Sequence, residues 1–384
     1  MIKTAWPAAL PMPAIALAIA GIGSIGTAEA APERIVTAAE RGTYIQIGRD
    51  LARLVAQPAG IALEAVPSKG SSENVRRLRL EPGVRLALVQ SDVVQAFMDE
   101  ARSGNSDALQ MIKPLRVVMP LYDEEIYFVT RADSPLTAVH EIRDKRINIG
   151  PVGSGTALTA TTLYRQMFGT AIDERNASTL SNEDALLQLA TDSSIDVAVI
   201  VTGQPAKIFS DMRPEARQFI KLLRLDAQAA PSQGAMGTYA ATNIRASSYP
   251  NWLSEDVPAL TTKAMLVTYD YQSSAVQNTL TRFARSLCTN FERLKADGHA
   301  KWQEVSLDLP PLGRNWSYYA PTERELVACN AGRQRAARAS GAPLPGGAGC
   351  SQAQSVLGLC RPARPQAKSG QAGAEDSQPR TQPR

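Results

Sequence analysis

The sequence is poor in the residues that metal binding and catalysis use most. It has only two histidines: His140 falls in an expected polar helix, and His299 follows a glycine. We expect both at the surface, where most unpaired polar side chains lie. Metal sites need clusters of ligands, and the sequence shows neither such a cluster nor a nucleophile–base pair or cofactor motif. It therefore predicts no metal, no cofactor and no enzyme, and it favours binding over chemistry.

Long apolar runs are lacking after residue 30, so no later segment is expected to cross a membrane. Residues 1–30 are typical of a signal peptide. Lys3 gives a weakly positive start, residues 14–26 are apolar, and Ala28-Glu29-Ala30 fits the cleavage pattern before Ala31. The apolar run is short for a bilayer span, which needs about 20 residues. We therefore expect cleavage of this segment and a periplasmic protein.

The folded part of the chain lacks an excess of basic residues. Residues 332–384 hold eight Lys or Arg against Glu375 and Asp376, a net charge of +6 within a total of +4. The rest of the chain is therefore at −2, and we expect no nucleic-acid partner. Because residues 332–384 are also rich in Gly, Pro, Ala, Gln and Ser, they are expected to form a disordered tail.

Cysteines are absent until the C-terminal quarter, which holds Cys288, Cys329, Cys350 and Cys360. An even number of cysteines in an exported chain favours disulfides, and four cysteines permit three pairings. We favour Cys288–Cys329, which would fasten a terminal segment to a long helix, together with Cys350–Cys360, which would close a small loop in the tail.

What the sequence does contain is an alternation of strands and helices. Strands are expected at residues 34–39, 61–66, 86–89, 115–121, 126–130, 147–149 and 195–201. Asp123-Glu124-Glu125 could serve acid–base chemistry, but an exposed turn between the lobes is the preferred interpretation. The alternation predicts an α/β protein with parallel-rich sheets, and its two sets of strands predict two lobes.

Residues 147–156 are the most informative stretch, because a short strand runs into a glycine-rich turn and then a helix. Thr156 stands where a P-loop needs lysine, and Val152 stands where a nucleophile elbow needs glycine. Two interpretations remain. The turn is a helix cap made by Ser154 or Thr156, or its N–H groups and the Thr156 hydroxyl hold a carboxylate of a ligand at the positive end of the helix.

Polar or glycine-rich loops recur at the carboxyl ends of the expected strands, where α/β proteins bind their ligands. They lie at residues 42–44, 68–74, 90–92, 154–156 and 203–205. If the two lobes face each other, these five loops converge on one cleft.

The motifs in these loops and beside them, in their order along the chain, resemble those of a known family. The chain is similar to the TAXI proteins (TRAP-associated extracytoplasmic immunogenic) over roughly residues 34–321. These are periplasmic solute-binding subunits of tripartite ATP-independent transporters. The motifs that carry the resemblance are Gly42-Thr43-Tyr44, Ser68-Lys69-Gly70-Ser71-Ser72-Glu73-Asn74, Gln90-Ser91-Asp92, Leu121-Tyr122, Gly153-Ser154-Gly155-Thr156, Ile195-Asp196, Gly203-Gln204-Pro205 and the closing residues 299–304.

The resemblance implies a two-lobed periplasmic binding protein fold of type II, with an interlobe cleft and crossover strands as a hinge. Residues 31–122 and 235–331 would form lobe 1 with C-terminal helices, and residues 123–234 would form lobe 2. It implies a monomer that closes on a small organic anion, such as 2-oxoglutarate or a glutamate-like amino acid, and delivers it to membrane permease subunits. The implied ligand contacts are Thr43, Tyr44, Ser71, Asn74, Gln90, Ser91, Asp92, Tyr122, Ser154, Gly155 and Thr156.

The chain departs from the family pattern at two positions and in its tail. Lys69 stands where the family usually has glycine, and it either adds a positive charge to the cleft or points outward. Arg85 replaces a common acidic residue, which we interpret as a surface change. Two other functions stay open: a sensor that presents its loaded state to a membrane receptor, and an enzyme on the same scaffold, for which no persuasive catalytic group is found.

Overall fold

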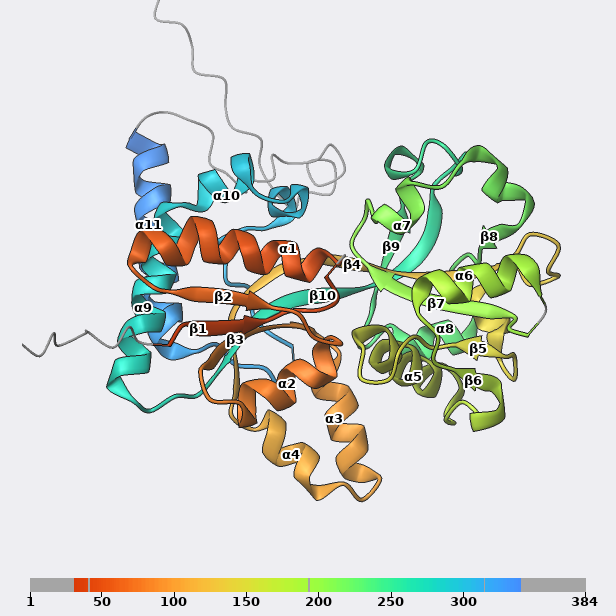
Figure 1. The fold of residues 1–384 in the computed structure, drawn as a ribbon, viewed down its shortest axis with the longest axis horizontal. Coiled ribbons are helices and arrows are strands. Elements are labelled where there is room, and N and C mark those ends of the chain that lie inside the picture. Colours follow the sequence, from red (N-terminus) through yellow and green to blue (C-terminus); the bar gives the residue numbers. More distant parts are fainter. Residues whose placement is uncertain (1–30, 41, 193, 314, 340–384) are drawn as a thin grey trace, which may run out of the picture.

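Two long strands, β4 (Leu115–Arg131) and β10 (Val257–Tyr269), run through the whole molecule and connect two α/β lobes (Figure 1). The computed structural model describes residues 31–40, 42–192, 194–313 and 315–339. The expected signal peptide and the Cys350–Cys360 pair lie outside this part of the chain. In the described ranges, no helix combines the length and the apolar character that a bilayer crossing requires.

The sheet of the first lobe has the strand order β2-β1-β3-β10-β4. The strands β1 (Glu33–Val36), β2 (Leu63–Val66) and β3 (Val84–Gln90) are parallel, whereas β10 is antiparallel to both β3 and β4. A strand from late in the chain thus lies between two early ones. Each early strand is followed by a helix, because the parallel connections cross over the sheet.

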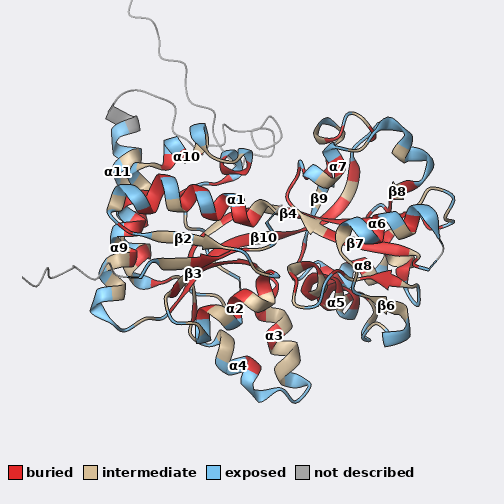
Figure 2. Cartoon of the chain, viewed as in Figure 1, coloured by how far each residue is buried: buried red, intermediate tan, exposed pale blue. Residues whose placement is uncertain are grey.

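Helices cover both faces of this sheet (Figure 1). On one face, α1 (Thr43–Asp50) continues as a π-helical stretch, Leu51–Ala56, and packs Ile47, Leu51 and Leu54 against the sheet. On the other face lie α2 (Ser71–Leu80), α3 (Val93–Arg102) and α4 (Ser106–Ile112). Because helices cover both faces, the central strands β3 and β10 are buried along nearly their whole length (Figure 2).

The second lobe is built on the order β4-β7-β5-β6. Its strands β5 (Ile147–Asn148), β6 (Ala177–Ser178) and β7 (Val197–Thr202) are parallel, and β7 is antiparallel to the end of β4. The other elements of this part are α5 (Gly155–Phe168), α6 (Asn182–Thr191), α7 (Lys207–Ser210), β8 (Ile220–Leu222), α8 (Ala230–Ala235) and β9 (Ala240–Ile244).

The expected turn at residues 122–125 does not exist, because β4 is one continuous strand. Its first half pairs with β10 and its second half pairs with β7. Glu124 and Glu125 lie where the strand passes between the lobes, and they are only 4% and 3% exposed. Consecutive strand residues point to opposite faces, so each carboxyl reaches a different buried partner. The expectation of an exposed acidic turn was therefore wrong.

The chain returns to the first lobe within β10, later than residue 235. Strand β9 pairs with the beginning of β10, and Ile244, Tyr249 and Trp252 pack with Phe209 in a core of the second lobe. Residues 235–256, which the sequence placed in lobe 1, therefore pack in lobe 2. The sequence pattern does not reveal this, because β9 is a mostly exposed strand without an apolar run.

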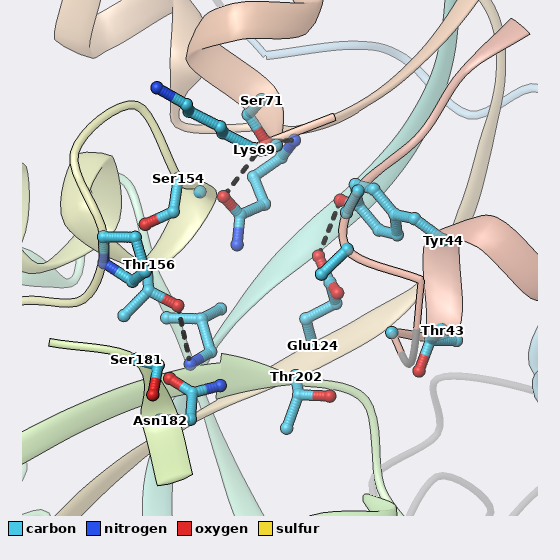
Figure 3. Close-up of a pocket in the computed structure, with 18 of the residues that line it drawn as sticks. Thr43, Tyr44, Lys69, Ser71, Glu124, Ser154, Thr156, Ser181, Asn182 and Thr202 are labelled. Carbon is cyan, nitrogen blue, oxygen red and sulfur yellow. Dashed lines mark hydrogen bonds between the residues drawn. The ribbon is translucent and has the colours of Figure 1, made fainter. Parts of the chain in front are cut away.

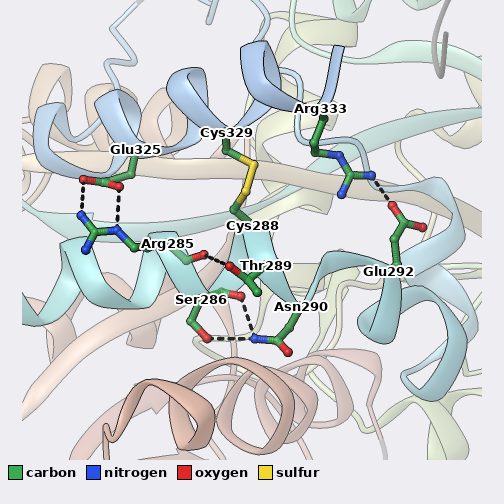
Figure 4. The surroundings of a disulfide bond; sticks show 9 residues. All are labelled: Arg285, Ser286, Cys288, Thr289, Asn290, Glu292, Glu325, Cys329 and Arg333. Carbon is green, nitrogen blue, oxygen red and sulfur yellow. Dashed lines mark hydrogen bonds and ion pairs between the residues drawn. A yellow bond between two sulfur atoms is a disulfide. The ribbon is translucent and has the colours of Figure 1, made fainter. Parts of the chain in front are cut away.

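The last helices of the described part of the chain are α9 (Ser274–Thr289), α10 (Phe291–Asp297) and α11 (Ala320–Ala339), which pack on the first lobe. The expected disulfide between Cys288 and Cys329 is confirmed, and it joins α9 to α11 (Figure 4). Arg285 and Glu325 form an ion pair across the same two helices at 2.9 Å. Residues 332–339 were expected in the disordered tail but belong to α11, because Ala- and Arg-rich sequences favour helix.

Candidate functional site

A cavity of about 240 Å³ lies between the two lobes (Figure 3). Both lobes and the crossover strand β4 supply its walls. Lobe 1 contributes Ala38, Ala39, Gly42, Thr43, Tyr44, Lys69, Gly70, Ser71 and Gln90. Strand β4 contributes Glu124, and lobe 2 contributes Pro151, Ser154, Gly155, Thr156, Ser181, Asn182, Glu183, Val201 and Thr202.

The helices α1, α2, α5 and α6 all begin at this cavity. Their N-cap residues are Gly42, Gly70, Ser154 and Ser181, and each of these either lines the cavity or precedes a residue that does. The first N–H groups of a helix have no partner within the helix, and the helix dipole places positive potential there. Helix N-termini from both lobes therefore make the cavity suited to a small anion.

The two lobes meet at Gly70 and Gly155, where only glycine allows so close an approach. A Cβ atom on Gly70 would lie 2.7 Å from the backbone nitrogen of Gly155, and Gly70 has φ +125°. A Cβ atom on Gly155 would lie 2.2 Å from Oε1 of Gln90. The structure therefore shows the cleft in a closed arrangement.

Gln90 is held at this contact by Ser71. The Ser71 hydroxyl donates to Oε1 of Gln90 at 3.1 Å and accepts from the Gln90 backbone N–H at 3.0 Å. The Gln90 amide nitrogen has no hydrogen-bond partner in the described chain, so it remains a free donor in a residue that lines the cavity. Ser71 and Gln90 thus both line the cavity between the lobes.

The glycine-rich turn of lobe 2 forms the helix cap that one of the two interpretations predicts. The Ser154 hydroxyl accepts from the N–H of Ala157 at 3.0 Å and caps α5. The Thr156 hydroxyl accepts from the N–H of Val201 at 3.3 Å, and its proton is still free to be donated. Ser154, Gly155 and Thr156 all line the cavity. The turn is therefore a helix cap whose remaining donors face the cleft.

Glu124 is the feature of the cavity that sequence reasoning missed. Its Oε2 accepts a hydrogen bond of 2.7 Å from the hydroxyl of Tyr44 (Figure 3). Burial raises the pKa of Glu124 to about 8, and the Tyr44 bond and the charge of Lys301 only partly oppose that shift. Burial, followed by the charge of Glu124, raises the pKa of Tyr44. Glu124 therefore supplies a carboxyl group that readily holds its proton.

Asn74 and Ser91 do not line the cavity, although both stand in the expected loops. The Asn74 amide donates to the carbonyl oxygens of Thr37 and Leu88, and it holds α2 against the sheet. The Ser91 hydroxyl lies 3.0 Å from that of Thr262 on β10. Both side chains point into lobe 1, because they form hydrogen bonds there with buried backbone carbonyl oxygens or with a neighbouring strand.

Asp92 and Tyr122 are also outside the cavity. Oδ2 of Asp92 accepts hydrogen bonds from the hydroxyls of Thr159 (2.7 Å) and Tyr239 (2.8 Å), both in the second lobe. Asp92 therefore bridges the lobes. Tyr122 is fully buried in the core of the first lobe, and the ammonium of Lys301 lies 5.5 Å from its ring centre.

The loop at residues 203–205 was expected in the cleft, but it does not line the cavity. Gly203 packs against Lys301, since a Cβ atom there would be 2.6 Å from Cε of that lysine. The Gln204 amide donates to Oε1 of Glu125 at 2.8 Å. Thr202, directly before this loop, does line the cavity.

Ser181, Asn182 and Glu183 were also missed, although a signal for them exists. Ser181 caps α6 by accepting from the N–H of Asp184 at 3.1 Å, and Ser-x-x-Asp is a typical start of a helix. Lys69 lines the cavity, but its ammonium points away from Tyr44 and Glu124 (Figure 3). Within the described ranges, no group of three or more His, Cys, Asp or Glu residues is placed to hold a metal ion.

Two α/β lobes joined by two crossover strands, with a cavity between the lobes, define the periplasmic binding protein fold. The strand order β2-β1-β3-β10-β4, with its late fourth strand, is that of type II, as expected. The chain belongs to the NMT1-like family, whose model matches residues 35–309.

The solved structures to which the chain is similar are distant in sequence. One is a Candida albicans gene product described as exhibiting the generic periplasmic binding protein fold. It has 12% identity and a TM-score of 0.41, over 77% of this chain and 79% of that one. Another is a TctC solute-binding protein from Polaromonas, with 17% identity and a TM-score of 0.38, over 78% of this chain and 96% of that one.

Proposed function

We propose that this protein is a periplasmic solute-binding receptor that captures a small organic anion between its lobes. The observation that carries the proposal is the convergence of the N-termini of α1, α2, α5 and α6 on one cavity between the lobes. Free backbone N–H groups and helix dipoles stabilise a carboxylate there without any catalytic group. The volume of about 240 Å³ suits a metabolite of a few carbon atoms.

The ligand contacts come from the expected residues that line the cavity, which are Thr43, Tyr44, Ser71, Gln90, Ser154, Gly155 and Thr156. The other expected residues stabilise the fold or the contact between the lobes instead; they are Asn74, Ser91, Asp92 and Tyr122. Candidate ligands are dicarboxylates such as 2-oxoglutarate and glutamate-like amino acids. A carboxylate at the start of α5 would accept from the backbone N–H groups and the Thr156 hydroxyl.

The resemblance to TAXI proteins supports transport as the role of the bound state. In that role the closed, loaded monomer delivers its solute to the membrane permease subunits of a tripartite ATP-independent transporter. The second candidate is a sensor that presents the same closed state to a membrane receptor. Genes for large and small permease subunits beside this one would favour transport.

A thermal-shift screen over organic acids and amino acids tests the proposed binding, followed by calorimetry on each hit. Gly155→Leu should lose more than tenfold in affinity, because its side chain would occupy the space of the Gln90 amide. Gly237→Leu is the matched control, since nothing lies within 4 Å of a Cβ atom there. If no acid stabilises the protein, or if Gly155→Leu binds the hits like the parent, the proposed site is wrong.

A further inference from the structure

Glu124 presents an unfilled hydrogen-bond acceptor in a residue that lines the cavity. Its Oε2 is bonded to the Tyr44 hydroxyl, and its Oε1 has no hydrogen-bond partner in the described chain. The other carboxyl group among the lining residues, that of Glu183, is on an exposed residue in the first turn of α6. Glu124 is therefore the buried acidic group of this cavity.

No basic side chain of the described chain forms an ion pair with Glu124. Lys301, whose charge acts on it, donates instead to Oε2 of Glu304 at 2.7 Å and to the carbonyl oxygen of Asp123 at 3.1 Å. The ammonium of Lys69 points away from it (Figure 3). A buried carboxylate without a cationic partner is costly, and a ligand that brings a cation would remove that cost.

We infer that Glu124, oriented by Tyr44, is the subsite for a ligand ammonium group, so that the cavity selects a zwitterionic amino acid over a dicarboxylate of the same size. The inference rests on the proposed function and narrows its ligand class. The carboxylate of the ligand lies at the helix N-termini, and its ammonium donates to Oε1 of Glu124. Charge-assisted bonds of this kind are short and strong, which makes the subsite selective.

A rival arrangement has the opposite pH dependence. A protonated Glu124 could donate to a second ligand carboxylate, and that affinity would be level below about pH 8 and fall above it. The ammonium requires an ionised Glu124. Since burial raises the pKa of Glu124 to about 8, affinity for an amino acid should rise by up to about tenfold per pH unit below pH 7, more slowly from pH 7 to 8, and level off above that. The ionisable groups acting on Glu124 are Tyr44, Lys301, Glu125 and Asp92.

The test is calorimetry with two ligand pairs that differ in the ammonium, L-glutamate with glutarate and L-aspartate with succinate. We expect the amino acid of at least one pair to bind more than tenfold tighter to the parent protein. In Glu124→Gln this preference should shrink to less than threefold, and the rise in affinity with pH should disappear. Glu125→Gln is the matched control, because its side chain bonds to Gln204 on the other face of the strand and should leave the preference intact.

Tyr44→Phe provides a second measurement if Glu124→Gln does not fold. It removes the hydrogen bond that lowers the pKa of Glu124, so the midpoint of the affinity–pH curve should move to higher pH. Equal or tighter binding of glutarate and succinate, or a preference that survives Glu124→Gln, overturns the ammonium subsite and leaves the proposed receptor function standing. If no acid or amino acid in the screen binds the folded protein, both proposals are wrong.

Discussion

At the scale of single residues, the Thr156 hydroxyl is the contact that most directly tests the anion site. It accepts from the N–H of Val201 and keeps its own proton for a ligand. A hydrogen bond to a charged group contributes about 1.5–3 kcal/mol, so Thr156→Val should bind the identified acid roughly ten- to a hundredfold more weakly. Thr161→Val on the same helix, whose hydroxyl bonds the Ala157 carbonyl oxygen, is the calorimetric control. Equal losses in the two variants would contradict a direct ligand contact.

Asp92 makes a second prediction at this scale, which concerns pH. Burial raises the pKa of Asp92 from 3.8 to about 6, and the bonds from Thr159 and Tyr239 only partly oppose it. A folded-state pKa above the unfolded value favours the folded form fully at low pH, and this contribution is lost as the pH rises through about 6. Between about pH 5 and pH 7, the free energy of unfolding should therefore fall more steeply in the parent than in Asp92→Asn. Urea denaturation at both pH values measures this, and parallel slopes would exclude Asp92 as the titrating group.

At the scale of elements, the Cys288–Cys329 disulfide closes a separation of 41 residues between α9 and α11. In the chain-entropy model, a disulfide that closes a loop of this length restricts the unfolded chain and so stabilises the folded protein by about 4 kcal/mol. The double variant Cys288→Ser/Cys329→Ser should thus lose about 2–4 kcal/mol of stability in denaturant and keep its ligand affinity. Removing the exposed Arg285–Glu325 pair across the same helices should cost less than about 1 kcal/mol. If removing the ion pair costs as much stability as removing the disulfide, the disulfide is not the main link between α9 and α11.

At the same scale, the loops and strands of the structure can be compared with those that the sequence predicts. The loops at residues 42–44, 68–71 and 154–156 were found because polar turns after apolar strands and before helices mark the ligand edge of a parallel sheet. Glu124 was missed because acidic residues rarely lie in buried strands. Its place depends on β10 and Tyr44, which are distant in sequence, and a local pattern carries no information about such partners. Asn74 and Asp92 stand in the right loops, but the direction of a side chain is set by tertiary contacts that the pattern does not contain.

At the scale of the whole molecule, ligand affinity should depend on lobe closure as well as on cavity contacts. Tyr239 does not line the cavity, yet its hydroxyl donates to Asp92 across the lobes at 2.8 Å. Tyr239→Phe removes this bond and leaves the lining unchanged. If closed and open forms exchange, apparent affinity falls in proportion to the closed population, so we expect a several-fold loss. Small-angle X-ray scattering should show the free variant more expanded than the free parent, with both compact at saturating ligand. Unchanged affinity together with an unchanged scattering profile would mean that the Asp92–Tyr239 contact does not hold the lobes together.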